Sequence, residues 1–306
     1  MRQKTQRTQG FSGVWENIRN RLDYITMKGI EAYTLFSEKD MNVFSGNATL
    51  YILMAMVPFF TLAAGMINFL PEKYLTDFCE LILSLFPNIP QIQAMMHNLF
   101  EQISPQKGTL VVSISILTML WSASNGISAL QLGMKRLSES RQSPIRQRLS
   151  AIMYTILFIL LIAALLIFRV FRTSLSSAAS GIASMLKMPE IAEIFNSVLQ
   201  DGGVITAGAL GIILLMMYSF MQGDQRKIRY QLPGAVFATV LWILFSAVFE
   251  WFITGFWSAS AVYGSLAAIF LTAMWMRTII IILFLGASLN EICYRHFRQT
   301  DSTNPE

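Results

Sequence analysis

Two ionisable side chains occur inside apolar stretches of the sequence, where a charge is costly. Glu250 occurs in segment 233–255, and Arg277 occurs in segment 263–290. Ionisable residues inside membrane-spanning helices mark substrate or ion pathways by default. We therefore take Arg277 as a candidate binding group for an anionic head group, with Glu250 nearer the outer mouth of the same path. The structural alternative for each is a hydrogen-bonded network or a side chain that snorkels to the interface.

Three further polar residues are candidates for contact with a substrate or with lipid. Asn125 is in the middle of segment 109–132, flanked by serine and glycine, and it could line a polar path. The alternative is an interhelical hydrogen bond, worth about 0.6 kcal/mol on average. Arg169 and Arg172 directly follow the apolar segment 151–168 and could attract lipid phosphates. Their alternative role is to anchor the end of that helix.

The nucleophiles and metal ligands of the sequence do not form a pattern typical of an enzyme. The sequence has two histidines, His97 and His296, and two cysteines, Cys79 and Cys293. Neither pair has metal-binding spacing, and no HExxH, GxSxG or glycine-rich phosphate loop is present. We expect no catalytic residue, no metal and no cofactor. A ribonuclease is a third function hypothesis, and it predicts RNA cleavage by the metal-supplemented protein.

The elements that must position these residues are membrane-spanning helices. The chain has 306 residues, of which 54% are hydrophobic and only 13% charged, against roughly 25% charged in a soluble domain. Segment 263–290 alone makes a helix about 42 Å long, and a hydrocarbon core is about 30 Å thick. The hydrophobic pattern predicts an all-α fold with six spans, at about 44–70, 109–132, 151–168, 203–221, 233–255 and 263–290.

Amphipathic helices are predicted between and before the spans. Segments 71–108 and 173–202 each show two helical apolar stripes separated by a proline, which is typical of a hairpin lying on the membrane or over the bundle. A basic amphipathic helix begins at Phe11, and it either lies on the membrane surface or packs on the protein's own cytoplasmic face. The order span, hairpin, span occurs at 44–132 and at 151–221, which is either an internal repeat or a coincidence.

The distribution of Lys and Arg predicts the orientation of the chain. These residues concentrate in 1–43, 133–150 and 222–232, whereas turn 256–262 has none. By the positive-inside rule both termini and the two basic loops are cytoplasmic, and both hairpins are outside. The chain then divides into a cytoplasmic segment 1–43, a membrane domain 44–290 and a cytoplasmic tail 291–306. The same rule explains the basic loop without RNA, so we expect no nucleic-acid partner.

Several short motifs, in order, resemble the YihY/virulence-factor BrkB family of bacterial inner-membrane proteins. Two residues depart from the family pattern: Ser288 stands where a Glu is usual in the GAxLN motif, and Arg277 stands where an aromatic is common. The resemblance covers roughly residues 30–292. It is carried by Tyr51, Pro58, Trp121-Ser122-Ala123-Ser124, Pro233-Gly234-Ala235, Trp242, Tyr263-Gly264-Ser265-Leu266, Trp275 and Gly286-Ala287-x-Leu289-Asn290.

The resemblance implies a multi-pass protein of the bacterial inner membrane whose partners include membrane lipids. The family has no established activity, and an earlier label as ribonuclease BN is regarded as mistaken. Our first hypothesis is a transporter or flippase for a lipid-like or anionic amphiphilic substrate. Because no ATPase motif is present, such transport would be passive or ion-coupled. The alternative is a non-transporting envelope scaffold that binds partner proteins.

Overall fold

The described part of the chain is helical, and no strand occurs within it. The computed structural model describes residues 26–67, 109–140, 143–160, 202–221, 227–256 and 260–303, together with Arg19 and Asp23. Both predicted hairpins and the start of the N-terminal helix lie outside these ranges. The helices are 26–38, α2 (Met41–Ile67), α5 (Thr109–Ser138), 144–160, α8 (Gly202–Met221), the short 3-10 helix η2 (Ile228–Tyr230), α9 (Leu232–Phe256) and α10 (Ser260–Thr303).

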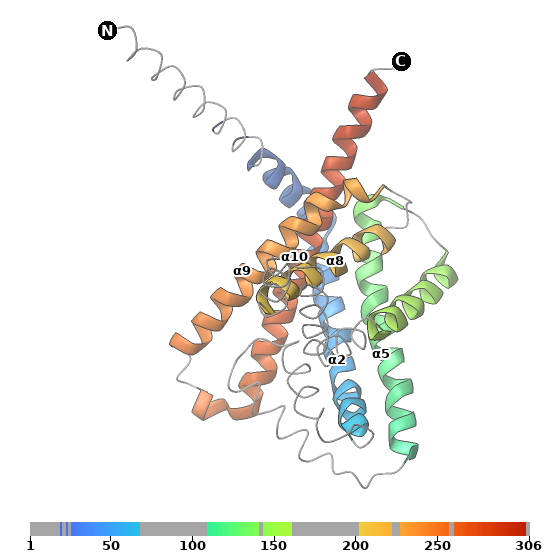
Figure 1. Ribbon diagram of the computed structural model, residues 1–306, viewed down its shortest axis with the longest axis vertical. Coiled ribbons are helices and arrows are strands. Elements are labelled where there is room, and N and C mark those ends of the chain that lie inside the picture. The colour runs from blue at the N-terminus through green and yellow to red at the C-terminus, as the bar shows by residue number, and fades with distance from the viewer. Residues whose placement is uncertain are drawn as a thin grey trace, which may run out of the picture.

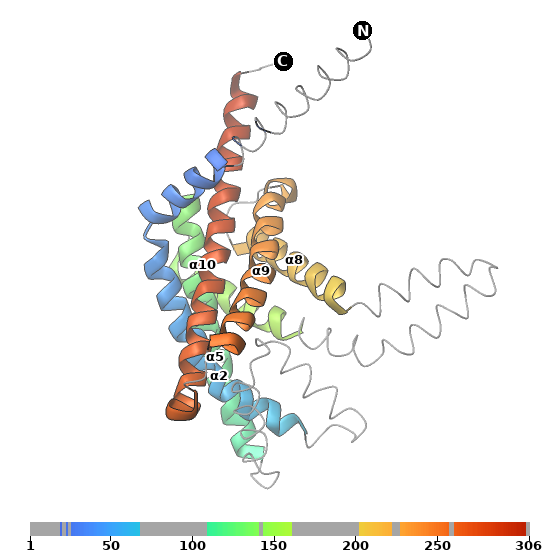
Figure 2. The same cartoon turned by 90° about the vertical axis from the view of Figure 1, so that its left-hand side faces the viewer.

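Three long helices, α2, α5 and α10, form the centre of the fold (Figure 1). Helix α2 packs along α5, and α10 contacts both of them and also α9, on which α8 packs. Pro58 lies within α2, where a proline removes one backbone donor and favours a bend. In Figure 2 the last turns of α2 change direction relative to its first turns. Side chains from all of these helices meet in one core, which includes Met41, Leu137, Tyr218 and Phe284.

Glycines bring the central helices into close contact. A Cβ atom at Gly126 of α5 would lie 2.7 Å from the Ile52 side chain of α2. A Cβ at Gly133 would lie 2.5 Å from the ring of Phe284 on α10. Small residues at helix contacts are the usual means of packing helices within a membrane, where lipid gives no hydrophobic drive for association.

The outer surface of α9 is apolar, as expected for contact with lipid. Two described helical segments, Leu232–Thr254 and Ile269–Arg298, are long and apolar enough to cross a membrane, each with a mean hydropathy of 2.1. Only 22% of the first segment is buried, so its apolar side chains do not form a soluble core. Four of them make one exposed stripe at helical spacing: Val240, Leu244, Val248 and Trp251.

Several helices run further than the predicted spans. Helix α10 has 44 residues, which is about 66 Å, and it continues to Thr303 through most of the predicted tail. Residues 133–138 and 144–150 of the predicted basic loop are also helical, so the non-helical connection is short. The hydrophobic pattern delimits only the part of a helix that lies in lipid, because polar residues can extend the same helix into water.

Candidate functional site

Arg277 of α10 is exposed and reaches the first turn of α2. Its Nη2 atom donates a hydrogen bond to Oδ1 of Asn42 at 3.1 Å. Asn42 is the second residue of α2, so the guanidinium lies level with the start of that helix. An arginine has five N–H donors, and this is the one side-chain hydrogen bond that the described residues accept from it. Among the described side chains no other acceptor takes its remaining donors, which suit the binding of an anion.

Glu250 of α9 is half-buried and is not joined to Arg277. Within the described ranges its carboxylate has no hydrogen bond or ion pair, and its backbone carbonyl accepts a bond from Thr254 Oγ1 at 2.9 Å. Trp275 lies beside Trp242, with ring centroids 6.2 Å apart, and donates to Ser246 Oγ at 3.3 Å. Because Trp275 of α10 is level with Trp242 and Ser246 of α9, Glu250 lies farther toward the C-terminus of α9 than the level of Arg277. The two charges therefore do not form an ion pair.

Asn125 of α5 accepts a hydrogen bond from the Nη1 atom of Arg148, which belongs to helix 144–160. The Arg148 guanidinium also lies over the ring of Trp121, 4.5 Å from its centroid. Its Nη2 atom is buried without a hydrogen-bond partner among the described residues. Asn125 therefore forms an interhelical hydrogen bond, and it also holds a cation between two helices.

The sequence does not single out Arg148, because it lies in a basic stretch that the positive-inside rule explains. The sequence of helix α5 does contain a pattern that indicates a partner for a cation. Trp121 and Asn125 are four residues apart, so they share one face of α5, and an aromatic ring beside an amide suits a guanidinium. Arg169 and Arg172, the other predicted lipid contacts, lie outside the described residues.

An apolar cavity of about 320 Å³ lies between α2, α5, helix 144–160 and α10. Its lining includes Ala55 and Phe59 of α2, Phe158, and Trp275 of α10. Met276 also lines it and directly precedes Arg277 along α10. The cavity is about twice the size of an engineered protein cavity of about 150 Å³ that binds benzene. It can therefore hold an apolar group adjacent to the segment that carries Arg277.

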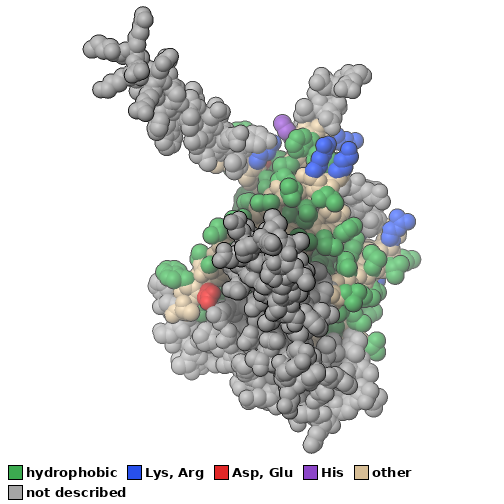
Figure 3. Space-filling view, viewed as in Figure 1, with side chains coloured by type: hydrophobic (Ala, Val, Ile, Leu, Met, Phe, Trp, Pro, Cys, Tyr) green, Lys and Arg blue, Asp and Glu red, His purple; other side chains and the backbone are tan. Residues whose placement is uncertain are grey.

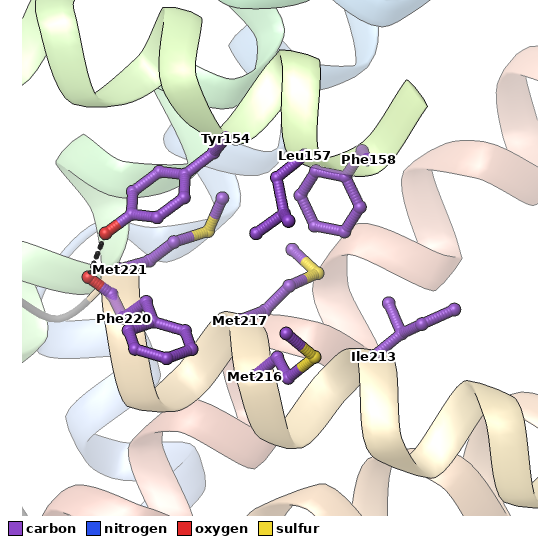
Figure 4. Close-up of a pocket in the computed structure, with 8 residues that line it drawn as sticks. All are labelled: Tyr154, Leu157, Phe158, Ile213, Met216, Met217, Phe220 and Met221. Atoms are coloured by element: carbon purple, nitrogen blue, oxygen red, sulfur yellow. Dashed lines mark hydrogen bonds between the residues drawn. The ribbon is translucent and has the colours of Figure 1, made fainter. Parts of the chain in front are cut away.

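A second apolar cavity is much smaller and separates helix 144–160 from α8. Its volume is about 30 Å³, and Figure 4 shows methionines and aromatic rings around it. Beside it the Tyr154 hydroxyl donates to the carbonyl oxygen of Phe220 at 2.7 Å. This hydrogen bond and the surrounding side chains tie the two helices together, which indicates a packing contact rather than a binding site.

Charged groups from three separate segments meet at one end of the bundle. Glu139, which follows α5, accepts a hydrogen bond from Lys39 Nζ at 2.6 Å and lies 3.6 Å from Arg295 Nη2 of α10. Arg295 also donates through Nε to the buried Glu291 at 2.7 Å. In Figure 3 the described Lys and Arg side chains of the visible face lie mostly toward the end that carries the C-terminus, with hydrophobic side chains next to them. The ring of Tyr230 packs here against Tyr294 and Phe297.

The contacts of Glu139 with Lys39 and Arg295 predict that the free energy of unfolding depends on pH. The hydrogen bond from Lys39, and then the charges of Lys39 and Arg295, hold the pKa of the Glu139 carboxyl below its ordinary value of 4.5. A lowered carboxyl pKa contributes stability that is present above the ordinary pKa and is lost as pH falls through the lowered value. Because Glu139 is exposed, we expect a small effect. The melting temperature of wild type should fall more than that of Glu139→Gln as pH drops below 4.5; parallel melting curves would contradict this.

The residues of the two C-terminal motifs face each other across the contact between α9 and α10. The Gly234 N–H donates to Asn290 Oδ1 at 2.7 Å. The first N–H groups of a helix have no partner within it, so Asn290 caps the start of α9. A Cβ at Gly234 would lie 2.1 Å from the carbonyl oxygen of Gly286. Ser288 is buried and donates to Phe284 of its own helix at 2.9 Å, so this departure from the motif leaves no unpaired hydroxyl.

A comparison with known families assigns the chain to one of them. The family described as virulence factor BrkB matches residues 32–306, which is most of the sequence and includes both motifs of the α9–α10 contact. The chain belongs to the BrkB virulence factor family. The resemblance seen in the sequence motifs is thus confirmed, and the apolar helices fit a membrane protein.

Relatives of this BrkB family member carry names that record little about function. The chain is 26% identical over 269 residues to the ribonuclease-like protein YfkH of Bacillus subtilis, covering 85% of this chain and 92% of that protein. It is 31% identical over 81 residues to a UPF0761 membrane protein of Glaesserella parasuis, covering 26% and 29% of the two chains. A UPF0761 membrane protein of Idiomarina loihiensis is 35% identical over 78 residues, covering 26% and 28%. No solved structure matches the chain.

The part of this BrkB family protein that the structure describes contains no group of three or more His, Cys, Asp or Glu side chains arranged to hold a metal ion. The polar groups that it does bring together are cations with amides or carboxylates, as in the pairs Arg277–Asn42, Arg148–Asn125 and Lys39–Glu139. Such groups suit the binding of anions.

Proposed function

We propose that this protein spans the bacterial inner membrane six times, has both termini in the cytoplasm, and moves a lipid-like anionic substrate across the bilayer. Its partners would be membrane lipids, with an amphiphile as substrate and no nucleic acid. The domain limits 44–290 and 291–306 belong to this proposal, and the two hairpins would lie on the outer side.

The contacts at the charged end of the bundle support this orientation. Lys39, Glu139 and Arg295 come from the N-terminal segment, the 133–150 loop and the tail, and Glu139 lies within ion-pair distance of both cations. Tyr230, from the 222–232 loop, packs on the tail as well. The four segments that the positive-inside rule assigns to the cytoplasm therefore meet at one end.

The observation that carries the transport proposal is the apolar cavity lined by Trp275 and Met276, the two residues of α10 that directly precede Arg277. An acyl or other apolar group in this cavity of about 320 Å³ would contact Trp275 and Met276. A head group on the same molecule would then lie near Arg277, whose guanidinium has only Asn42 as a hydrogen-bond acceptor among the described side chains. An arginine on the same helix as part of the wall of an apolar cavity suits an amphiphile, because each half of the ligand then finds its own kind of surface.

The other candidate residues have supporting roles in this proposal. Glu250, farther along α9, would place a carboxylate near the outer mouth of the substrate path. Asn125 would hold Arg148, which adds a second cation between α5 and helix 144–160. Arg169 and Arg172 would contact lipid phosphates at the outer end of the third span.

Lipid scrambling by the purified protein in liposomes tests the proposal. Fluorescent lipids with anionic head groups should lose their leaflet asymmetry faster in liposomes that contain the wild type than in empty liposomes. Arg277→Ala should slow this at least about tenfold, since a hydrogen-bonded charge interaction is worth about 1.5–3 kcal/mol and about 1.4 kcal/mol is tenfold in rate. The matched control is Arg298→Ala, an exposed arginine near the end of α10, which should scramble at the wild-type rate.

Two results would favour other functions. Equal scrambling by wild type and Arg277→Ala would remove the role assigned to Arg277. No scrambling by the wild type with any lipid would favour the alternative of an envelope scaffold. The name of YfkH says that it is ribonuclease-like, so the purified protein should also be tested for RNA cleavage with added metal, and we expect none.

A further inference from the structure

A large polar groove lies at the charged end of the bundle, between the start of α2, the end of α5 and helix 144–160. Its volume is about 1080 Å³. The charged side chains that line it are Lys39, Asp40, Lys135, Arg136 and Glu139. Asn42, the partner of Arg277, does not line this groove, whereas its neighbour Val43 does. The groove and the Arg277 pair therefore lie on different faces of α2.

Lys135 lines this groove and is almost completely buried, with 6% of its surface exposed. Its ammonium nitrogen has no hydrogen-bond partner among the residues that the structure describes. A lysine in the last turn of a helix can bind the terminal carbonyl oxygens, but here the Lys135 carbonyl accepts from the Ser140 N–H at 3.1 Å. Burial without a partner lowers the pKa of the Lys135 ammonium. A buried polar group without a partner calls for an explanation, and a bound ion is one such explanation.

The remaining charges of the groove leave an excess of positive charge. Lys39 donates to Glu139 at 2.6 Å, and Arg295 lies 3.6 Å from the same oxygen, so the Glu139 carboxylate is neutralised. Lys135 and Arg136 then face a single carboxylate, Asp40. Arg136 is exposed at the rim, where a guanidinium can bind two oxygens of one phosphate.

We propose that this groove binds a phosphate group, with Lys135 as its buried counter-ion and Arg136 as a second ligand at the rim. The phosphate would belong either to a lipid head group or to a soluble phosphate. The bound anion would pair with the Lys135 ammonium, because an opposite charge within a few ångströms favours its charged form. This site is separate from Arg277, and the inference stands whether or not the protein moves lipid.

Thermal unfolding of the full-length protein tests this site. In detergent, inorganic phosphate should raise the melting temperature of wild type by about 3 °C at roughly ten times its Kd, compared with sodium chloride at equal ionic strength. In nanodiscs, phosphatidic acid should give a similar rise over phosphatidylcholine alone. A rise with both probes identifies the phosphate group itself as the ligand, and a rise only with phosphatidic acid identifies a lipid head group.

Lys135→Met is the decisive variant. Without phosphate it should melt at or above the wild-type temperature, because removing a buried unpaired charge costs nothing, and it should lose the rise caused by phosphate. The matched control Lys227→Met removes an exposed lysine and should keep the full rise. If Lys135→Met does not fold, Arg136→Gln should lose most of the rise. A full rise in the variant that folds, or no rise in wild type with either probe, would overturn the proposal.

Discussion

Gly234→Ala should destabilise this protein more than the addition of one methyl group at any other position of its described helices. The new Cβ would lie 2.1 Å from the carbonyl oxygen of Gly286 and 2.6 Å from the Asn290 side chain. One of these neighbours is backbone of α10, so the two helices would have to separate. Overpacking of this kind costs about 3 kcal/mol, and separation would also break the Gly234–Asn290 hydrogen bond of 2.7 Å. We expect a fall in melting temperature of roughly 10 °C.

The measurement is a thermal melt of the detergent-purified protein followed by size-exclusion chromatography. The control is Gly208→Ala, the same substitution in the apolar helix α8, where a Cβ would meet nothing within 4 Å. Replacing glycine by alanine in an open helix position is worth up to about 1 kcal/mol in favour of alanine, so this control should melt at or above the wild-type temperature. A Gly234→Ala protein as stable as the control would mean that α9 and α10 are not packed as described.

Ala55→Phe should abolish lipid scrambling if the apolar cavity carries the substrate. Ala55 is buried on α2 and lines the cavity of about 320 Å³. A phenyl ring fits a space of this size, since about 150 Å³ suffices for benzene. The ring would occupy the place of the substrate's apolar group without unfolding the protein, and scrambling should fall more than tenfold, below that of Arg277→Ala.

The control for this experiment is Ala247→Phe, which adds the same ring to the exposed face of α9. That ring would face lipid, so scrambling and melting temperature should stay at the wild-type values. Melting curves for both variants separate a filled cavity from a damaged fold. Wild-type scrambling by a folded Ala55→Phe protein would rule out this cavity as the substrate path.

The sequence predicts the helices well, because apolar periodicity follows from the local chain. The predicted spans 203–221 and 233–255 agree closely with α8 and α9, and the family is confirmed. The buried side of helix 26–38, formed by Ala32, Leu35 and Phe36, packs on the protein, while its Met27 and Ile30 remain exposed. The described part of this helix thus packs on its own protein through one face and exposes Met27 and Ile30 on another, while its contact with the membrane surface stays a prediction.

The candidate site was harder to predict, since it depends on contacts between residues far apart in the sequence. Nothing in the local sequence shows that Arg277 would lie beside Asn42, 235 positions away. Arg148 and Lys135 lie in a basic segment, and the positive-inside rule alone explains its charge. The sequence therefore provides no reason to single out either residue. A lysine that is buried and one that faces water look alike in a sequence, and only the packing of α2 on α5 distinguishes them.

The length of α10 has a mechanical consequence. The helix is unbroken from Ser260 to Thr303, so it behaves as one stiff shaft. Arg295, in its C-terminal part, contacts Glu139, and Trp275 lies about 30 Å away along the same axis. A rotation of the C-terminal part of α10 would therefore also turn Trp275, which lines the apolar cavity.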